Sequence, residues 1–279
     1  MTSTGNTEQY EAWNGESGQR WVADADRRDR VLAPVADALL AVADPRPGER
    51  VLDLGCGCGV TTLAAARAVG PAGSVTGVDL SAPMLGLARE RRDDDALSHV
   101  DFVQGDAQVH DVGGPYDLAM GRFGTMFFAD PVAAFTNVGR ALRPGARLCL
   151  ATWQPLADNE WLIVPGTVLL RYGKLPAGAG DGPGMFAQSE PIRVTRVLRG
   201  AGFADIALEP ITLDLCLGAD PDEATDYLAD SGVGRAVLDT VPDHDRPIAL
   251  EAVRAALTDH TDATGVHLGA AIWLITAAR

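Results

Sequence analysis

The sequence predicts an α/β fold in which a mostly parallel sheet is covered by helices on both faces. Short apolar segments alternate with longer segments of helical periodicity between residues 50 and 153. The short segments are continuously apolar, as expected for strands that are buried on both faces. The first of them runs directly into a glycine-rich turn that opens a helix. Alternating strands and helices of this kind are typical of doubly wound domains.

Turn residues and hydrophobic periodicity set the expected elements. Strands are expected at residues 50–54, 74–79, 100–104, 116–120 and 147–153, and helices at residues 60–69, 82–92 and 130–142. Ser81 and Asp130 stand where two of these helices need an N-cap, and each is followed by a proline in the first turn.

Four regions are expected along the chain. Residues 1–44 form a helical arm, and residues 45–153 form the core that carries the glycine turn. Residues 154–189, rich in proline and glycine, form a cap insertion with one short helix. Residues 190–279 return to the core with a helix at 190–202 and strands at 205–217 and 266–277. A helical insertion at 221–260 interrupts this last region.

The charge balance argues against nucleic acid as a partner. The 279 residues carry a formal net charge of -15, which repels a phosphate backbone. No apolar run approaches the roughly 20 residues that span a bilayer, so no membrane association is expected. Residues 1–11 are polar and lack the apolar core of a signal peptide. We therefore expect a cytoplasmic protein, either a monomer or a homodimer.

No metal is expected from the cysteines. Cys56 and Cys58 form a Cys-x-Cys pair, but no second Cys/His pair stands at zinc-site spacing. Both lie in the glycine turn, where small side chains are needed. Among the histidines, His110 after the third strand could act as a base, but a solvated loop histidine is the preferred interpretation.

The glycine turn at residues 55–59 favours a nucleoside-containing cofactor. About 20 residues further on, the second strand ends in Asp79, where a carboxylate can accept hydrogen bonds from both ribose hydroxyls. A dinucleotide fingerprint needs a third glycine where Val60 stands. Asp53, two residues before the turn, suits a cofactor with an ammonium group better than one with a pyrophosphate. A nicotinamide-dependent oxidoreductase is therefore the weaker alternative.

Three segments resemble the class I S-adenosylmethionine-dependent methyltransferases, and in particular the ubiquinone and menaquinone biosynthesis subgroup. These segments are residues 51–59, 78–81 and 104–107, and the resemblance covers roughly residues 50–153. It implies a Rossmann-like methyltransferase core with a mostly parallel seven-stranded sheet. It also implies S-adenosyl-L-methionine as the cofactor of an enzyme.

The resemblance also implies where the cofactor binds. The methionine end is expected at the glycine turn and the fourth strand, against Asp53, Gly55, Cys56, Gly57 and either Gly121 or Arg122. Asp79 is expected to hold the ribose, and the adenine is expected against Leu80, Met84, Asp106 and Ala107. Asp106 would accept from the adenine amino group, while the Ala107 N–H would reach a ring nitrogen.

Aromatic residues are the candidates for the acceptor side. The segment after the fourth strand and its neighbours offer an apolar wall of Phe123, Met126, Phe127 and Trp153, with Tyr10 from the arm. Trp13 and Trp21 are expected near the sulfonium, which gains cation–π attraction from an aromatic face. The arm is then either a closing lid or a simple cover for the sheet.

We therefore expect methyl transfer to a small, largely apolar metabolite, with an N, O or C acceptor atom left open. An anionic carboxylate, phenolate or enolate fits Arg122. A peptide or natural-product scaffold is an alternative acceptor, and a module that binds the cofactor without catalysis is another. The sequence assigns no catalytic residue.

Overall fold

The computed structural model describes residues 6–175 and 182–279. Residues 1–5 of the expected arm and residues 176–181 of the expected cap insertion lie outside this range. The chain divides into two compact units. Unit 1 comprises residues 1–153, 183–210 and 273–279, and unit 2 comprises residues 154–182 and 211–272.

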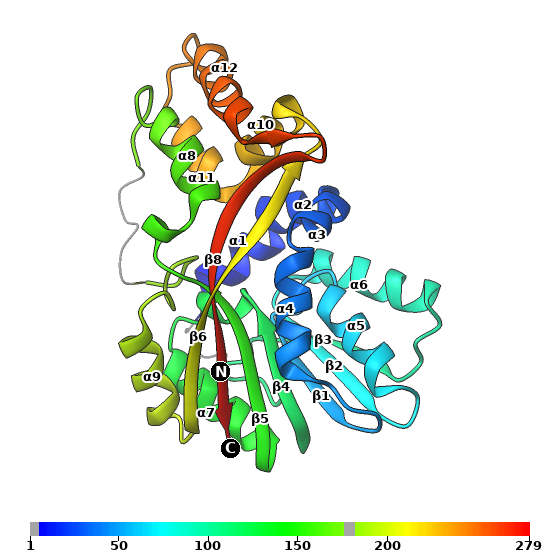
Figure 1. The fold of residues 1–279 in the computed structure, drawn as a ribbon. Helices are drawn as coiled ribbons and strands as arrows, with labels where there is room; N and C mark the ends of the chain where they lie inside the picture. Colours follow the sequence, from blue (N-terminus) through cyan, green and yellow to red (C-terminus); the bar gives the residue numbers. More distant parts are fainter. Residues whose placement is uncertain (1–5, 176–181) are drawn as a thin grey trace. The chain divides into compact units, whose positions relative to one another are not determined.

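The sheet has the order β3-β2-β1-β4-β5-β8-β6, with the short β7 paired to β8 (Figure 1). Its strands are β1 (Arg50–Leu54), β2 (Ser74–Asp79), β3 (Val100–Gln104), β4 (Tyr116–Arg122), β5 (Leu142–Trp153), β6 (Ala204–Gly218), β7 (Thr261–Asp262) and β8 (Gly265–Ala278). The first five pair in parallel, so their carboxyl ends lie at one edge of the sheet. The prediction of a mostly parallel α/β sheet is confirmed.

Helices cover both faces of the sheet in unit 1. On one face lie α4 (Ala33–Ala43), α5 (Val60–Val69) and α6 (Ala82–Asp94), and on the other lie α7 (Pro131–Ala141) and α9 (Pro191–Gly200) (Figure 1). The two expected N-caps are confirmed. Ser81 accepts the Met84 N–H at 3.4 Å, and Asp130 accepts the Ala133 N–H at 2.9 Å. Local capping thus sets where α6 and α7 begin.

The N-terminal region is helical, as expected. It consists of α1 (Thr7–Asn14), α2 (Glu16–Ala23) and α3 (Ala25–Val31), followed by α4. Helix α2 packs against α6, and α3 is joined to α4 through Leu32. From here on, "arm" means only α1, α2 and α3, the part of residues 1–44 that precedes α4.

Unit 2 contains helices together with residues 211–218 of β6, all of β7 and residues 265–272 of β8. Its helices are η2 (Leu156–Asp158), α8 (Glu160–Leu169), α10 (Pro221–Asp230), α11 (Gly232–Leu238), α12 (Arg246–Leu257) and η3 (Thr258–His260). Helix α8 packs against α11 and α12, and α10 packs against α12. Apolar side chains such as Leu162, Leu228 and Leu257 are buried among them.

Strands β4 and β5 extend beyond the bounds that the sequence predicted. Strand β4 continues to Arg122, so Gly121 and Arg122 lie within the strand rather than after it. Strand β5 begins at Leu142, ahead of the expected start at 147. The register with β4 shifts between Tyr116 and Leu118, and this irregularity accommodates the Pro144-Gly145 turn inside the strand.

No helix in residues 6–175 and 182–279 is long and apolar enough to cross a membrane.

Candidate active site

The glycine turn connects β1 to α5 at the carboxyl edge of the sheet. Gly55 has a φ of +66°, which disfavours other residues. A Cβ at this position would lie 2.6 Å from the Gly124 Cα, so side chains are excluded on steric grounds as well. Gly124 belongs to η1 (Gly124–Phe127), the turn that follows β4. The backbones of the two turns therefore touch where β1 and β4 end.

Asp53 is fully buried on β1 and keeps one oxygen unsatisfied. Its Oδ2 accepts hydrogen bonds from Thr61 Oγ1 at 2.7 Å and from Thr62 Oγ1 at 2.6 Å. Its Oδ1 has no hydrogen-bond partner among the described residues. Burial raises the pKa of this carboxyl, and the two threonine hydrogen bonds oppose that shift. A buried acceptor without a partner beside a glycine turn fits a cationic ligand group such as an ammonium.

Asp79 joins the ends of β1 and β2. Its Oδ2 accepts the Gly57 N–H at 2.8 Å, and its Oδ1 accepts the Ser81 N–H at 2.8 Å. Burial raises the pKa of Asp79, while these backbone N–H groups favour the ionised form and oppose the shift. The carboxylate therefore supports the local backbone in addition to the ribose-binding role that we expect for it.

The loop after β3 is held by its own side chains and by α7. Asp106 accepts hydrogen bonds from the backbone N–H of Gln108 at 3.0 Å and from its side-chain Nε2 at 2.9 Å. Asn137 of α7 donates to the carbonyls of Ala107 and His110, at 2.9 and 2.7 Å. The Ala107 side chain is buried in the core, so only its backbone is available to a ligand.

Met84 lies in a small apolar cluster with the arm. It is 6 % exposed and packs with Ala25 and Cys58, against which Trp13 and Trp21 also lie. Leu80 precedes α6, and its carbonyl accepts a hydrogen bond from Asn14 of the arm at 2.9 Å. Of the four residues expected around the adenine, Leu80 and Met84 thus lie next to the arm.

Arg122 is oriented toward α3 and α4. Its Nη1 donates to the Leu32 carbonyl at 3.3 Å, and its Nη2 lies 4.0 Å from Asp29 Oδ1. Gly121 is buried, and a Cβ there would lie 2.9 Å from the Leu54 carbonyl oxygen. Close contact between β1 and β4 therefore excludes a side chain at the Gly121 position.

Phe123 and Trp153 form a stacked pair at the ends of β4 and β5. Their ring centroids are 4.1 Å apart with an interplanar angle of 9°. Phe123 adopts a φ of +65°, which is uncommon for a bulky residue and is typical of functional sites when the surroundings impose it. Trp153 is buried, while Phe123 keeps part of its surface exposed.

The other aromatic candidates divide into two groups. The Trp13 ring packs edge to face against two other rings, with centroid distances of 5.3 Å to Phe127 and 5.9 Å to Trp21. The arm therefore reaches the turn after β4. Met126 of that turn is 1 % exposed, and Tyr10 is 49 % exposed on α1. The structure therefore brings Trp13, Trp21 and Phe127 together, while Met126 is enclosed in the interior and Tyr10 lies at the surface.

The cysteines of the glycine turn are buried thiols. Burial raises the pKa of Cys56 well above its ordinary value and that of Cys58 to about 12, so both stay protonated at neutral pH. Within residues 6–175 and 182–279, no group of three His, Cys, Asp or Glu side chains is arranged to hold a metal ion.

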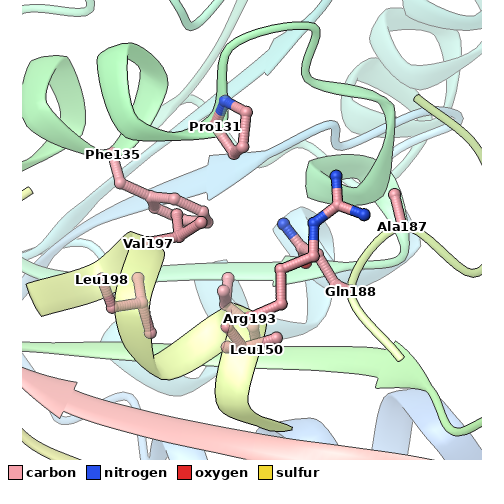
Figure 2. A pocket seen from close by; sticks show the side chains of 9 residues that line it. Pro131, Phe135, Leu150, Ala187, Gln188, Arg193, Val197 and Leu198 are labelled. Carbon is pink, nitrogen blue, oxygen red and sulfur yellow. The ribbon is translucent and has the colours of Figure 1, made fainter. Parts of the chain in front are cut away.

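A small cavity between α7, α9 and β5 lies on the other face of the sheet from α5. It is lined by Pro131, Phe135, Leu150, Ala187, Gln188, Arg193, Val194, Val197 and Leu198 (Figure 2). Its volume of about 10 Å³ is close to the minimum for a single water molecule. It is therefore too small to hold a cofactor.

Sequence reasoning missed several residues that shape the site. Thr61 and Thr62 hold Asp53, Asn137 holds the loop after β3, and Asn14 binds the loop after β2. Only the threonines had a local signal, since hydroxyls in the first turn of a helix often bind nearby polar groups. The asparagines act through contacts far apart in sequence.

Fold and site together define an α/β protein with a glycine turn and two buried carboxylates, Asp53 and Asp79, at the carboxyl ends of β1 and β2. Residues 51–145 match the family described as a methyltransferase domain. The chain is 32 % identical to nocamycin O-methyltransferase from Saccharothrix syringae over 242 residues, which cover 81 % of this chain and 84 % of that protein. It is 37 % identical to demethylmenaquinone methyltransferase from Staphylococcus aureus over 177 residues, which cover 60 % of this chain and 73 % of that protein.

Among solved structures, the YcgJ protein from Bacillus subtilis superposes with a TM-score of 0.58 at 18 % identity. The match covers 88 % of this chain and 98 % of that protein, and it shows a shared fold. The chain belongs to the class I S-adenosylmethionine-dependent methyltransferases. It is an enzyme whose cofactor is S-adenosylmethionine, and the oxidoreductase alternative is wrong.

Proposed function

We propose that this enzyme methylates a small, planar, conjugated natural product that carries an ionisable hydroxyl or enol. The Phe123–Trp153 stack carries this proposal. Its two rings lie nearly parallel, and Phe123 is partly exposed at the end of β4, next to the glycine turn of β1. A flat aromatic surface gains most from a flat conjugated partner. The relatives named nocamycin O-methyltransferase and demethylmenaquinone methyltransferase support a small-molecule acceptor.

Binding and orientation are the main tasks of the protein in methyl transfer. Bound S-adenosylmethionine supplies an electrophilic methyl group on a sulfonium. We expect Asp53 Oδ1 to bind the ammonium and Asp79 to bind the ribose hydroxyls, which fixes the cofactor at the glycine turn. Leu80, Met84, Asp106 and Ala107 then hold the adenine. With the cofactor fixed, aligning the acceptor is the remaining requirement.

The acceptor side follows from the aromatic groups. Phe123 positions the plane of the acceptor, and the Trp13–Phe127 contact excludes water from the edge of the site. An acceptor that arrives as a phenolate or enolate needs no general base, which agrees with the lack of an assigned one. The formal charge of -15 opposes nucleic acid as an acceptor.

An acceptor panel with methyl-labelled cofactor tests this proposal. The panel contains polyphenols, quinols, cyclic enols, aliphatic amines, peptides, transfer RNA and DNA. We expect transfer to the planar phenols, quinols or enols, and a matched set of saturated alcohols serves as the control. Transfer to peptide or nucleic acid with none to the planar compounds would contradict the proposal.

A further inference from the structure

The arm is fastened directly to the loop that follows Asp79. Asn14, the last residue of α1, accepts the Ala82 N–H on its Oδ1 at 2.9 Å and donates from Nδ2 to the Leu80 carbonyl at 2.9 Å. Ser81 Oγ donates to the Trp13 carbonyl at 2.7 Å. These three hydrogen bonds between the arm and residues 80–82 are called the clasp.

The amide group of Asn14 has all of its hydrogen-bonding groups paired. Besides the Leu80 carbonyl, Asn14 Nδ2 reaches the Tyr10 carbonyl of its own helix at 2.8 Å. Both amide hydrogens and the amide oxygen therefore have partners. The Leu80 and Ala82 groups lie 66 and 68 residues away in the sequence, so Asn14 links the end of α1 to the loop after β2.

Close packing at Gly18 supports the same arrangement. A Cβ on Gly18 would lie 1.9 Å from the Trp13 carbonyl oxygen and 2.9 Å from Ser81 Oγ. Gly18 is buried in α2, and its lack of a side chain lets α2 approach the hydrogen bond between Ser81 and Trp13. A larger residue at position 18 would therefore disturb the clasp from the arm side.

The clasp connects two parts of the site. Leu80 follows Asp79, whose carboxylate binds the Gly57 and Ser81 N–H groups. Trp13 precedes Asn14, and its ring contacts Phe127 in the turn after β4. The same turn of the arm therefore touches the cofactor loop through one residue and the acceptor side through the next.

We propose that Asn14 is a positioning residue that couples closure of the arm to cofactor binding. Asn14 holds the backbone of residues 80–82 in the conformation that places Asp79 and Leu80 against the cofactor. The coupling is reciprocal by thermodynamic necessity: if arm closure raises cofactor affinity, the cofactor raises the closed fraction of the arm by the same factor. The inference concerns the cofactor alone and does not depend on the acceptor class proposed above.

Four proteins test the coupling: the wild type, Asn14→Ala, Gly18→Ala and the control Glu11→Gln. Glu11 lies on α1 of the arm and is exposed, so this substitution leaves the clasp and Arg20 intact. Calorimetry gives the dissociation constant of S-adenosylhomocysteine. Trypsin cleavage after Arg20, with and without saturating S-adenosylhomocysteine, gives the ligand-dependent protection of the arm. The melting temperature of each ligand-free protein reports general loss of stability.

We expect Asn14→Ala to weaken S-adenosylhomocysteine binding about tenfold, since both side-chain hydrogen bonds from Asn14 to residues 80–82 are lost. Ligand-dependent protection of the arm should fall with it, and Gly18→Ala should show the same joint loss. Glu11→Gln should match the wild type in both measurements. A merely structural asparagine would lower the ligand-free melting temperature and speed cleavage equally with and without ligand. That pattern overturns the proposal, as does a dissociation constant within twofold of the wild type in both variants.

Discussion

The carboxylate of Asp79 accepts the backbone N–H of Gly57 at 2.8 Å, so the end of β2 is bonded to the turn after β1. These two elements meet because β1 and β2 pair in parallel, with Leu54 opposite Val78. The same oxygen atoms are expected to bind the ribose. Asp79 would then serve both ligand binding and local backbone geometry, so a substitution that keeps the size of the side chain is the appropriate test.

Asp79→Asn should weaken S-adenosylhomocysteine binding at least tenfold. The substitution keeps the size of the side chain but removes the charge, and hydrogen bonds to charged groups are worth about 1.5–3 kcal/mol each. Titration calorimetry measures the effect. Asp101→Asn is the control, because Asp101 is exposed on neighbouring β3. An unchanged dissociation constant in Asp79→Asn would show that the ribose lies elsewhere.

Cofactor affinity should fall as the pH is lowered. Burial raises the pKa of Asp53 and Asp79 above the ordinary value of 3.8, so both take up protons at a higher pH in the folded protein than in the unfolded chain. Protonation in the folded state favours folding of the ligand-free protein but removes the charge that an ammonium needs. Calorimetry from about pH 7 to about pH 5 should show weakening binding.

Asp53→Asn provides the comparison for this pH dependence. The variant should bind more weakly at neutral pH and show a flatter pH profile, because one titrating carboxyl is gone. An identical slope in the variant and the wild type would exclude Asp53 as the source.

Asp29→Asn should destabilise the protein by about 1–3 kcal/mol, whereas Asp26→Asn should cost under about 0.5 kcal/mol. Both carboxylates lie 2.8 Å from Arg91, but the Asp29 side chain is 20 % exposed and that of Asp26 is 87 % exposed. Asp29 also lies 4.0 Å from Arg122. Removing the Asp29 charge therefore takes a carboxylate partner from both the Arg91 and the Arg122 guanidinium groups, which are largely buried. Urea unfolding measures both values, and equal effects would contradict this ranking.

Phe123→Leu should raise the KM of a planar acceptor about two- to tenfold, because an aromatic stack is worth roughly 0.5–1.5 kcal/mol beyond its area. Phe123→Tyr keeps the ring and should retain a KM near that of the wild type. The affinity for S-adenosylhomocysteine should stay unchanged in both, since Phe123 stacks on Trp153 and is proposed to contact the acceptor rather than the cofactor. Steady-state kinetics with a planar acceptor gives the answer. A KM in Phe123→Leu equal to that of the wild type would remove the basis for a planar substrate.

The sequence alone determined the α/β core, because its signals are local. The buried strands are continuous apolar segments, and the first strand runs from Arg50 to Leu54 as expected. Glycines that need positive φ angles mark the turn after β1, and Ser81 and Asp130 mark helix starts through bonds three residues away. Periodicity, capping and turn chemistry act over a few residues, so they can be read directly from the order of amino acids.

Tertiary structure decided the partners of the site residues, because those contacts join segments far apart in the chain. Nothing near Asn14 in the sequence indicates that it binds Leu80 and Ala82. Arg122 was expected at the ligand, and the fold brings it beside Leu32 and Asp29. Hydrogen-bond donors and charges are satisfied by whichever groups packing brings within about 3 Å, and that outcome depends on the whole fold.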